Sequence, residues 1–211
     1  MLEPLKQSII GRAIENSKIE INIVDFREFS TNKHKKVDDY TYGGGNGMLL
    51  TPQPIIDAII SLKTKNSYVV YLSPCGKIFN QEKAKELSKI EHLILICGHY
   101  EGIDQRIIDN YVDEEISIGD YILTCGEIPA MVLVDSIVRL LPSVLHNDKS
   151  KTTESFENNL LEYPQYTRPQ NFRGMIVPEV LINGNHQEVD KWRENQALIK
   201  TKINRPDLLN K

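Results

Sequence analysis

The sequence predicts an α/β protein built around a mainly parallel sheet. Short apolar runs typical of buried strands, such as residues 68–72 and 93–97, alternate with segments of helical periodicity. Two apolar runs stop abruptly at a glycine, Gly98 and Gly119, and polar residues follow each glycine. Strands that end in this way expose main-chain N–H and C=O groups at the edge of a sheet, where open α/β folds bind ligands. We therefore expect the binding site at these two strand ends.

The first third of the chain combines regular elements with a long polar segment. Residues 8–16 favour a short helix, and residues 18–26 alternate in the manner of a strand. Residues 30–48 are polar and then glycine-rich, which predicts a mobile loop. Residues 54–62 are typical of a helix, because a proline is tolerated in the first turn.

The central region supplies the predicted sheet and one of its helices. Residues 68–72 form a β-branched and aromatic run that ends at a turn over residues 73–76, and residues 93–97 form the next strand. Between these strands, Asn80 has the position of an N-cap for a helix that extends to about Lys89.

A further helix is expected from Pro129, with Pro142 ending it. The apolar face of this helix is formed by Met131, Val134 or Leu133, Ile137 and Leu140. Residues 146–159 are polar and have no hydrophobic period, so residues 146–164 are expected to be an interdomain linker that becomes ordered when something binds. This linker would separate a domain of residues 1–145 from a small helical domain of residues 165–211.

The last helix is expected to start near Asn185. Asn185 and Glu188 have the spacing of a capping box, and Val189, Trp192 and Ile199 fall on one side of the helix.

Composition limits the broad class of protein. The chain has 211 residues, of which 40% are hydrophobic and 26% charged, enough for one large domain or one domain with an appendage. No apolar run approaches the roughly eighteen residues that span a bilayer, and no signal peptide is recognisable, so we expect a cytoplasmic protein with no membrane partner. The net charge of −4 gives no support to nucleic-acid binding, which would need local basic patches. The three cysteines have no C-x-x-C spacing and are expected to be free thiols.

Several polar features have both a functional and an ordinary explanation. The glycine-rich loop at residues 42–47 is followed by Met48, so it is no Walker loop, and no G-x-G-x-x-G follows a strand. The sequence leaves two interpretations of this glycine-rich loop equally open, namely a loop that closes on a substrate and a plain surface turn. Asp135 and Arg139 have the spacing of a surface ion pair, and His99 is either catalytic or structural. Taken alone, these residues predict an α/β enzyme with a ligand site built from main chain.

A set of short motifs in order along nearly the whole chain resembles one family. They are VDD at 37–39, YGGGNGM at 42–48, YLSP at 71–74, CGHYEGID at 97–104, SIGDY at 117–121, YTRP at 166–169, GNH at 184–186 and RPDL at 205–208. The chain is similar to the bacterial tRNA (guanine-N1)-methyltransferases, the TrmD family of the SPOUT class. The resemblance implies a parallel sheet with a deep trefoil knot that holds S-adenosyl-L-methionine, which no sequence pattern alone could predict. It also implies a homodimer whose active sites are each completed by the second subunit, and tRNA as substrate, methylated at N1 of the guanosine directly 3′ of the anticodon.

The resemblance assigns roles position by position. The cofactor would be bound by Tyr71, Leu72, Ser73, Pro74, Gly98, Tyr100, Glu101, Gly102, Ile118, Gly119, Asp120, Tyr121, Ile122, Leu123, Gly126 and Pro129. Arg139 would be catalytic, because a fixed cation stabilises the negative charge that develops on guanine O6. Glu154 stands where the family has an aspartate and would be the base that removes the N1 proton. Glu162 is the alternative base and, with Asp38 and Arg168, would contact the tRNA.

Positive charge for the tRNA phosphates is expected from three regions of the chain. The residues are Lys33, Lys35 and Lys36, then Arg168 and Arg173, and finally Lys191, Arg193, Lys200, Lys202 and Arg205. Mg²⁺ is compatible with the family, although no metal-ligand cluster is visible in the sequence.

Two departures from the family pattern stand beside the resemblance. Cys125 replaces a glycine next to the cofactor and would narrow the pocket if its φ were positive. The family's first strand and its Phe-Pro turn have no counterpart, so either the start is misassigned or the sheet has one strand fewer. Two rival functions are a SPOUT relative that methylates another RNA position or a ribose hydroxyl, and an RNA-binding homologue with impaired catalysis.

Overall fold

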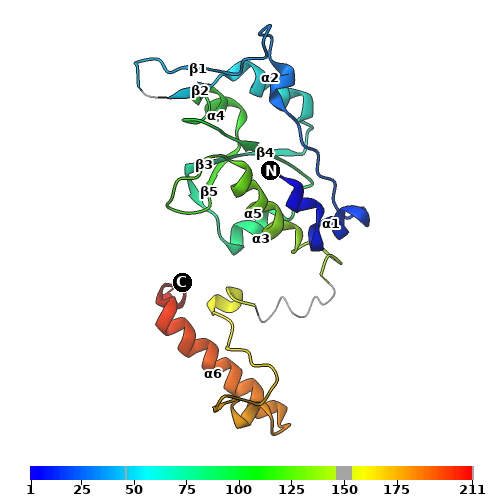
Figure 1. Ribbon diagram of the computed structural model, residues 1–211, viewed down its shortest axis with the longest axis vertical. Helices are drawn as coiled ribbons and strands as arrows, with labels where there is room; N and C mark the ends of the chain where they lie inside the picture. The colour runs from blue at the N-terminus through cyan, green and yellow to red at the C-terminus, as the bar shows by residue number, and fades with distance from the viewer. Residues whose placement is uncertain (46, 146–153, 211) are drawn as a thin grey trace. The chain divides into compact units, whose positions relative to one another are not determined.

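The computed structural model describes residues 1–45, 47–145 and 154–210, which divide into two compact units, residues 1–145 and 146–211 (Figure 1). The helices of the first unit are α1 (Ser8–Glu15), α2 (Pro52–Leu62), α3 (Gln81–Leu87), α4 (Gln105–Tyr111) and α5 (Glu127–Val138). Its strands are β1 (Asp38–Tyr40), β2 (Met48–Leu50), β3 (Ser67–Ile78), β4 (His92–Cys97) and β5 (Glu114–Ser117). Short 3₁₀ helices cover Glu3–Lys6 and Phe26–Phe29.

The central sheet is parallel, as predicted, with the strand order β4-β3-β5. Leu72, in the middle of β3, lies opposite Cys97, the last residue of β4, and opposite Ile116 near the end of β5, so β4 and β5 both end beside the middle of β3. The turn predicted at residues 73–76 lies inside β3, where the pairing with β5 shifts between Leu72 and Lys77. Pro74 cannot donate a ladder hydrogen bond, which explains an irregularity at this point.

Alternate residues of β3 face the two sides of this sheet. Val69 and Tyr71 belong to a core with α2 and α4, whereas Val70 and Leu72 belong to a core with α3 and α5. Figure 1 shows the two pairs of helices on opposite faces of the strands. The unit is therefore a three-layer α/β structure, with a third small core where α1 packs against the end of α5.

The region before β1 contains one wrong prediction. The helix predicted at residues 8–16 is confirmed as α1, but residues 18–26 form no strand. Ile19 and Ile21 pack beside the core shared by α1 and α5, while the next apolar residues, Ile23 and Val24, are exposed. The alternation thus reflects one-sided packing of an extended chain rather than pairing in a sheet.

The segment predicted as a loop at residues 30–48 also contains regular structure. β1 and β2 form an antiparallel hairpin in which Asp38 lies opposite Leu50 and Tyr40 opposite Met48. Leu50 also bridges Ile103, so the hairpin is attached to the segment that follows β4. The described residues between the two strands include four glycines with positive φ, Gly43, Gly44, Gly45 and Gly47, a conformation that favours glycine.

The helices predicted in the first unit are present with shifted ends. α2 and α5 each begin two residues before the prediction, and α5 ends at Val138, before Pro142. Asn80 is the N-cap of α3, and its side chain accepts a hydrogen bond from the main-chain N–H of Lys83 at 2.9 Å. This cap confirms the predicted helix start.

The second unit is built around α6 (His186–Asn204). The other elements described there are β6 (Asn171–Phe172), β7 (Met175–Ile176) and 3₁₀ helices at Glu157–Asn159, Glu179–Leu181 and Pro206–Asn210. The Asn185 side chain accepts from the N–H of Glu188 at 3.4 Å, which confirms the predicted cap. Ala197 and Thr201 are the buried residues of α6, and Ile199 is exposed.

Candidate functional site

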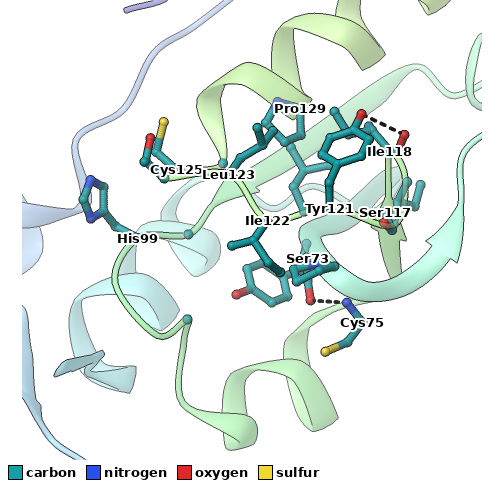
Figure 2. A pocket seen from close by; sticks show the side chains of 18 of the residues that line it. Ser73, Cys75, His99, Ser117, Ile118, Tyr121, Ile122, Leu123, Cys125 and Pro129 are labelled. Carbon is teal, nitrogen blue, oxygen red and sulfur yellow. Dashed lines mark hydrogen bonds between the residues drawn. The ribbon is translucent and has the colours of Figure 1, made fainter. Parts of the chain in front are cut away.

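A cavity of about 260 Å³ lies at the carboxyl ends of β4 and β5, beside residues 71–75 of β3 (Figure 2). It is lined by residues 71–75, 98–102, 116–119, 121–126 and Pro129. Residues 71–75 lie within β3, residues 98–102 follow β4, residues 116–119 include the end of β5, and Pro129 belongs to the first turn of α5. The cavity is thus at the strand ends where the sequence places the binding site.

All but one of the residues predicted to bind the cofactor line this cavity. They are Tyr71, Leu72, Ser73, Pro74, Gly98, Tyr100, Glu101, Gly102, Ile118, Gly119, Tyr121, Ile122, Leu123, Gly126 and Pro129. Among the described lining residues Asp120 does not occur, although both of its neighbours do. Cys125, expected next to the cofactor, also lines the cavity, and sequence reasoning missed five further lining residues: Cys75, His99, Ile116, Ser117 and Thr124. Four of these five lie beside or within a quoted motif, whereas Thr124 lies outside the motifs.

The bend after β5 is held by hydrogen bonds to its own backbone. Ser117, which is buried, donates from its hydroxyl to the Gly119 carbonyl at 3.0 Å and accepts from the Gly119 N–H at 3.2 Å. The Tyr121 hydroxyl donates to the Ile118 carbonyl at 3.2 Å, and Figure 2 shows this bond beside Pro129. The bend is therefore shaped before any ligand binds, which lowers the entropic cost of binding.

The end of β4 is in close contact with β3 and α5. The Gly98 carbonyl accepts a hydrogen bond from the Gly126 N–H at 2.9 Å. A Cβ atom at Gly98 would lie 3.0 Å from the hydroxyl oxygen of Tyr71, so the absence of a side chain leaves this wall open. Burial, reinforced by the charge of Glu115, raises the pKa of Tyr71 to about 12. The Tyr71 hydroxyl therefore stays protonated at neutral pH.

Two polar side chains of the described lining, His99 and Glu101, are two residues apart in sequence but differ in their surroundings. Glu101 is the single carboxylate among the described lining residues. His99 packs edge-on against Tyr100 with ring centroids 4.8 Å apart, and its Nδ1 accepts from the Tyr100 N–H at 3.0 Å. Figure 2 shows His99 apart from Ile122 and Tyr121. These contacts favour the structural interpretation of His99.

The cavity also has thiols at its edge. Cys97 precedes Gly98, and burial, with the nearby charges of Glu127 and Cys125, raises its pKa to about 12. Cys125 lines the cavity, and its sulfur is 3.5 Å from that of Met1. The φ of Cys125 is not positive, so the strain considered for a residue in place of glycine does not arise.

Comparison with known proteins identifies the family of this chain. The family model described as tRNA (Guanine-1)-methyltransferase TrmD matches residues 1–211. The chain belongs to this family. A tRNA (guanine-N(1)-)-methyltransferase from Ruminiclostridium cellulolyticum is 57% identical over 208 residues, which cover 97% of this chain and 89% of the relative. The relative of the same name from Mycoplasmopsis pulmonis is 60% identical over 205 residues, covering 97% and 89%. That from Clostridioides difficile is 54% identical over 211 residues, covering 98% and 91%.

Arg139, which the resemblance to the TrmD family predicts to be catalytic, lies at the C-terminal end of α5. Arg139 is the C-cap of this helix and half-buried, and its N–H donates to the Asp135 carbonyl at 3.3 Å. α5 has 12 residues and begins at the cavity, so its two ends are about 18 Å apart. The structure therefore does not bring Arg139 to the cavity of its own chain.

The two candidate bases of this TrmD family member belong to the second unit. Glu154 and Glu162 are both half-buried. The Glu162 N–H donates to the Ser155 hydroxyl at 3.0 Å, and its carboxylate accepts a hydrogen bond from the side chain of Gln165. The Glu162 carbonyl also accepts from the Lys200 ammonium at 3.0 Å. Within this unit, the segment that follows residue 153 is thus bonded to α6.

The remaining predicted substrate contacts are surface positions. Asp38 begins β1 of the hairpin, and Arg168 is exposed in the second unit. Several of the predicted basic contacts are paired with carboxylates: Lys35 with Glu28, Lys36 with Asp39 at 3.5 Å, Arg193 with Asp190 at 3.5 Å and Arg205 with Asp207 at 2.7 Å. Binding of phosphates there would require these exposed pairs to exchange partners, which is inexpensive at a solvated surface.

Two features are absent from the residues that the structure describes. Among them, no group of three or more histidine, cysteine, aspartate or glutamate side chains could hold a metal ion. None of the helices in this part of the chain has the length and apolar character needed to cross a membrane.

Proposed function

We propose that this enzyme transfers a methyl group from S-adenosyl-L-methionine to N1 of the guanosine directly 3′ of the tRNA anticodon. Relatives that are 54% to 60% identical over nearly the whole chain carry the name tRNA (guanine-N(1)-)-methyltransferase. The observation that carries the proposal is the cavity at the strand ends, which gathers residues from three separate TrmD motifs. Fold alone would not specify a reaction, but a site composed of family motifs does.

The cavity suits a nucleoside cofactor. Its size is close to the lower end of ligand pockets, about 300 Å³. Main-chain groups of residues 72–74 and 118–123 can hydrogen-bond the edge of an adenine, and Glu101 can accept from a ribose hydroxyl or face a sulfonium cation. A side chain at Gly98 would point at the Tyr71 hydroxyl and reduce this space. When bound, S-adenosyl-L-methionine supplies an electrophilic methyl group.

The guanine has chemical requirements that the chain meets with two side chains. N1 carries a proton and is a poor nucleophile until the proton leaves, so a base must reach it. We assign this role to Glu154, with Glu162 as the alternative. Deprotonation places negative charge on O6, and the fixed cation of Arg139 stabilises it. The methyl transfer that follows is an in-line displacement, for which positioning is the main requirement.

The position of Arg139 supports a homodimer. Arg139 and the cavity lie at opposite ends of α5, which supports the proposal that the arginine acting beside one cavity comes from a second chain. Exposed apolar side chains near the cavity end of α5, at Ile122, Ile128 and Val132, would be buried by such a partner. Each active site would then combine the cofactor cavity of one subunit with residues of the other.

The deep trefoil knot of the SPOUT class is part of the same proposal. The chain leaves β5 on one side of β3, crosses the carboxyl end of β3 and reaches the end of β4, where the Gly126 N–H bonds to the Gly98 carbonyl. This crossing is the kind of path that the knot requires. A cytoplasmic location follows from the tRNA substrate.

The decisive experiment follows tritium from labelled S-adenosyl-L-methionine into tRNA transcripts with guanosine or adenosine 3′ of the anticodon. We expect label only with guanosine, recovered as N1-methylguanosine. Label at another base or on a ribose would favour a SPOUT relative with a different target. Binding without transfer would favour the RNA-binding alternative. Chelation with EDTA in the same assay tests whether Mg²⁺ is needed.

The choice of base is tested by single-turnover rates of Glu154→Gln and Glu162→Gln. We expect the Glu154 variant to lose about 10²-fold or more and the Glu162 variant to lose less. A near-normal rate for Glu154→Gln with a collapsed rate for Glu162→Gln would reverse the assignment.

A further inference from the structure

We propose that Gly47, in the glycine-rich loop of the β1–β2 hairpin, is a positioning residue that keeps the Glu101 carboxylate at the wall of the cofactor cavity. The inference rests on the proposed function, because Glu101 matters here as a ligand of the methyl donor. It assigns a role to the glycine-rich loop, for which the sequence left a substrate loop and a plain turn equally open.

Gly47 is in direct contact with the side chain of Glu101. A Cβ atom at Gly47 would lie 2.6 Å from both Cγ and Oε1 of Glu101, far inside van der Waals distance. The absence of a side chain at this position is therefore what allows Glu101 to lie against the loop. Gly43 and Gly44, in the same loop, have no atom within 4 Å of a Cβ built on them, so the contact belongs to Gly47 and is not general to the loop.

The backbones on both sides of this contact are held together. The Glu101 N–H donates to the Met48 carbonyl at 3.1 Å, and the Leu50 N–H donates to the Gly102 carbonyl at 3.0 Å. The Asp104 N–H donates to the Leu50 carbonyl at 3.1 Å. With three main-chain hydrogen bonds across the junction, a methyl group added at Gly47 cannot simply move the hairpin away. The flexible end of the Glu101 side chain has to rotate instead.

Rotation of the Glu101 side chain would move its carboxylate away from the cavity wall. The cavity would then lose its negative charge, since Glu101 is the single carboxylate among the described lining residues. The same hairpin carries Asp38, which lies opposite Leu50. The β1 strand, which is expected to contact tRNA, and the loop that positions the Glu101 carboxylate are thus parts of one hairpin. An RNA seated on this hairpin would act on the donor cavity through Gly47 and Glu101.

The test compares the affinity of the full chain for S-adenosylhomocysteine, by calorimetry, in five proteins: wild type, Gly44→Ala, Gly47→Ala, Glu101→Ala and the double variant Gly47→Ala with Glu101→Ala. Gly44 is the matched control, because its φ of +81° is close to the +95° of Gly47 and alanine is equally strained there. We expect Gly47→Ala to weaken binding about tenfold or more, as for one lost hydrogen bond to a charged group, and Gly44→Ala to change it less than about twofold.

The double variant decides whether Gly47 acts through Glu101. If it does, Gly47→Ala adds no loss once Glu101 is alanine, since the atoms it would strike are gone. An equal loss in both backgrounds, or a Gly47→Ala protein that binds like Gly44→Ala, would overturn the inference. So would a thermal midpoint of Gly47→Ala far below that of Gly44→Ala, because the contact would then be structural. If the wild-type chain itself bound no S-adenosylhomocysteine, the proposed function would fail instead.

Discussion

Replacing Gly126 with alanine should separate α5 from β4 and disrupt the base of the cofactor cavity. A Cβ atom at Gly126 would lie 2.7 Å from the Cα of Cys97 and 2.7 Å from the nitrogen of Gly98. Both are backbone atoms, so no side chain can rotate away. The φ of Gly126 is −79°, which alanine adopts without strain, and the whole cost therefore comes from this contact.

The magnitude follows from two contributions. The helix and strand have to separate by about 1 Å to restore ordinary contact, and strain of this kind in a packed interior costs about 1–3 kcal/mol. The separation also breaks the 2.9 Å hydrogen bond from the Gly126 N–H to the Gly98 carbonyl, which contributes about 1 kcal/mol. The free energy of unfolding should fall by about 2–4 kcal/mol, a large share of the stability of a typical domain.

Urea unfolding, with and without S-adenosylhomocysteine, measures both consequences. We expect Gly126→Ala to lower the free energy of unfolding by the stated amount and to lose most of the stabilisation that the ligand gives the wild type. Thr124→Ala is the control, since Thr124 is exposed and lines the same cavity, and its effect should be under about 0.5 kcal/mol. Unchanged stability and affinity in Gly126→Ala would refute the close approach of α5 to β4.

Three further predictions concern other parts of the chain. The free energy of unfolding should fall as pH rises from about 9 towards 12, because Cys97 and Tyr71 have pKa values raised to about 12 in the folded protein and the unfolded chain releases their protons first. Cys97→Ala should make this fall less steep. An equally steep fall in the variant would contradict the raised pKa of Cys97. Thr201→Val should cost about 1–3 kcal/mol in a thermal melt, since the buried Thr201 hydroxyl accepts the Leu161 N–H at 2.8 Å, whereas a serine there should retain most of the stability. Iodoacetamide at pH 8 should modify the exposed Cys75 well before Cys97, and mass spectrometry showing the reverse order would speak against the burial of the Cys97 thiol.

The sheet and the place of its ligand site were predictable because both follow from local patterns. Buried parallel strands require continuous apolar runs, and residues 68–72 and 93–97 have them. A run that stops at Gly98 marks the strand end on which the cavity forms. Most of the residues around the cavity were predicted from the family resemblance. Every residue has the same main-chain groups, so the sequence does not show what these groups bind.

The elements that were missed depend on contacts distant in sequence. β1 is polar and short, and Tyr40 is 80% exposed, so no hydrophobic alternation marks it as a strand. It pairs with β2, and β2 in turn is held by the segment around Gly102. Residues 18–26 show the opposite error, because their alternation of apolar and polar residues predicted a strand, and the structure has none there. Local periodicity reports which side of a segment is buried but not which neighbour buries it.

The distribution of the proposed site residues along the chain has a functional consequence. The proposed cofactor cavity is formed by residues of the first unit, whereas the candidate bases belong to the second unit and Arg139 lies at the C-terminal end of α5. Donor binding should therefore survive changes at Glu154 and Arg139 that abolish methyl transfer, while changes at Gly126 should impair both. Such a pattern would mean that a subunit binds its cofactor alone but depends on a partner for chemistry. A loss of donor affinity in Glu154→Gln would instead require the base and the cofactor to be in contact before any tRNA binds.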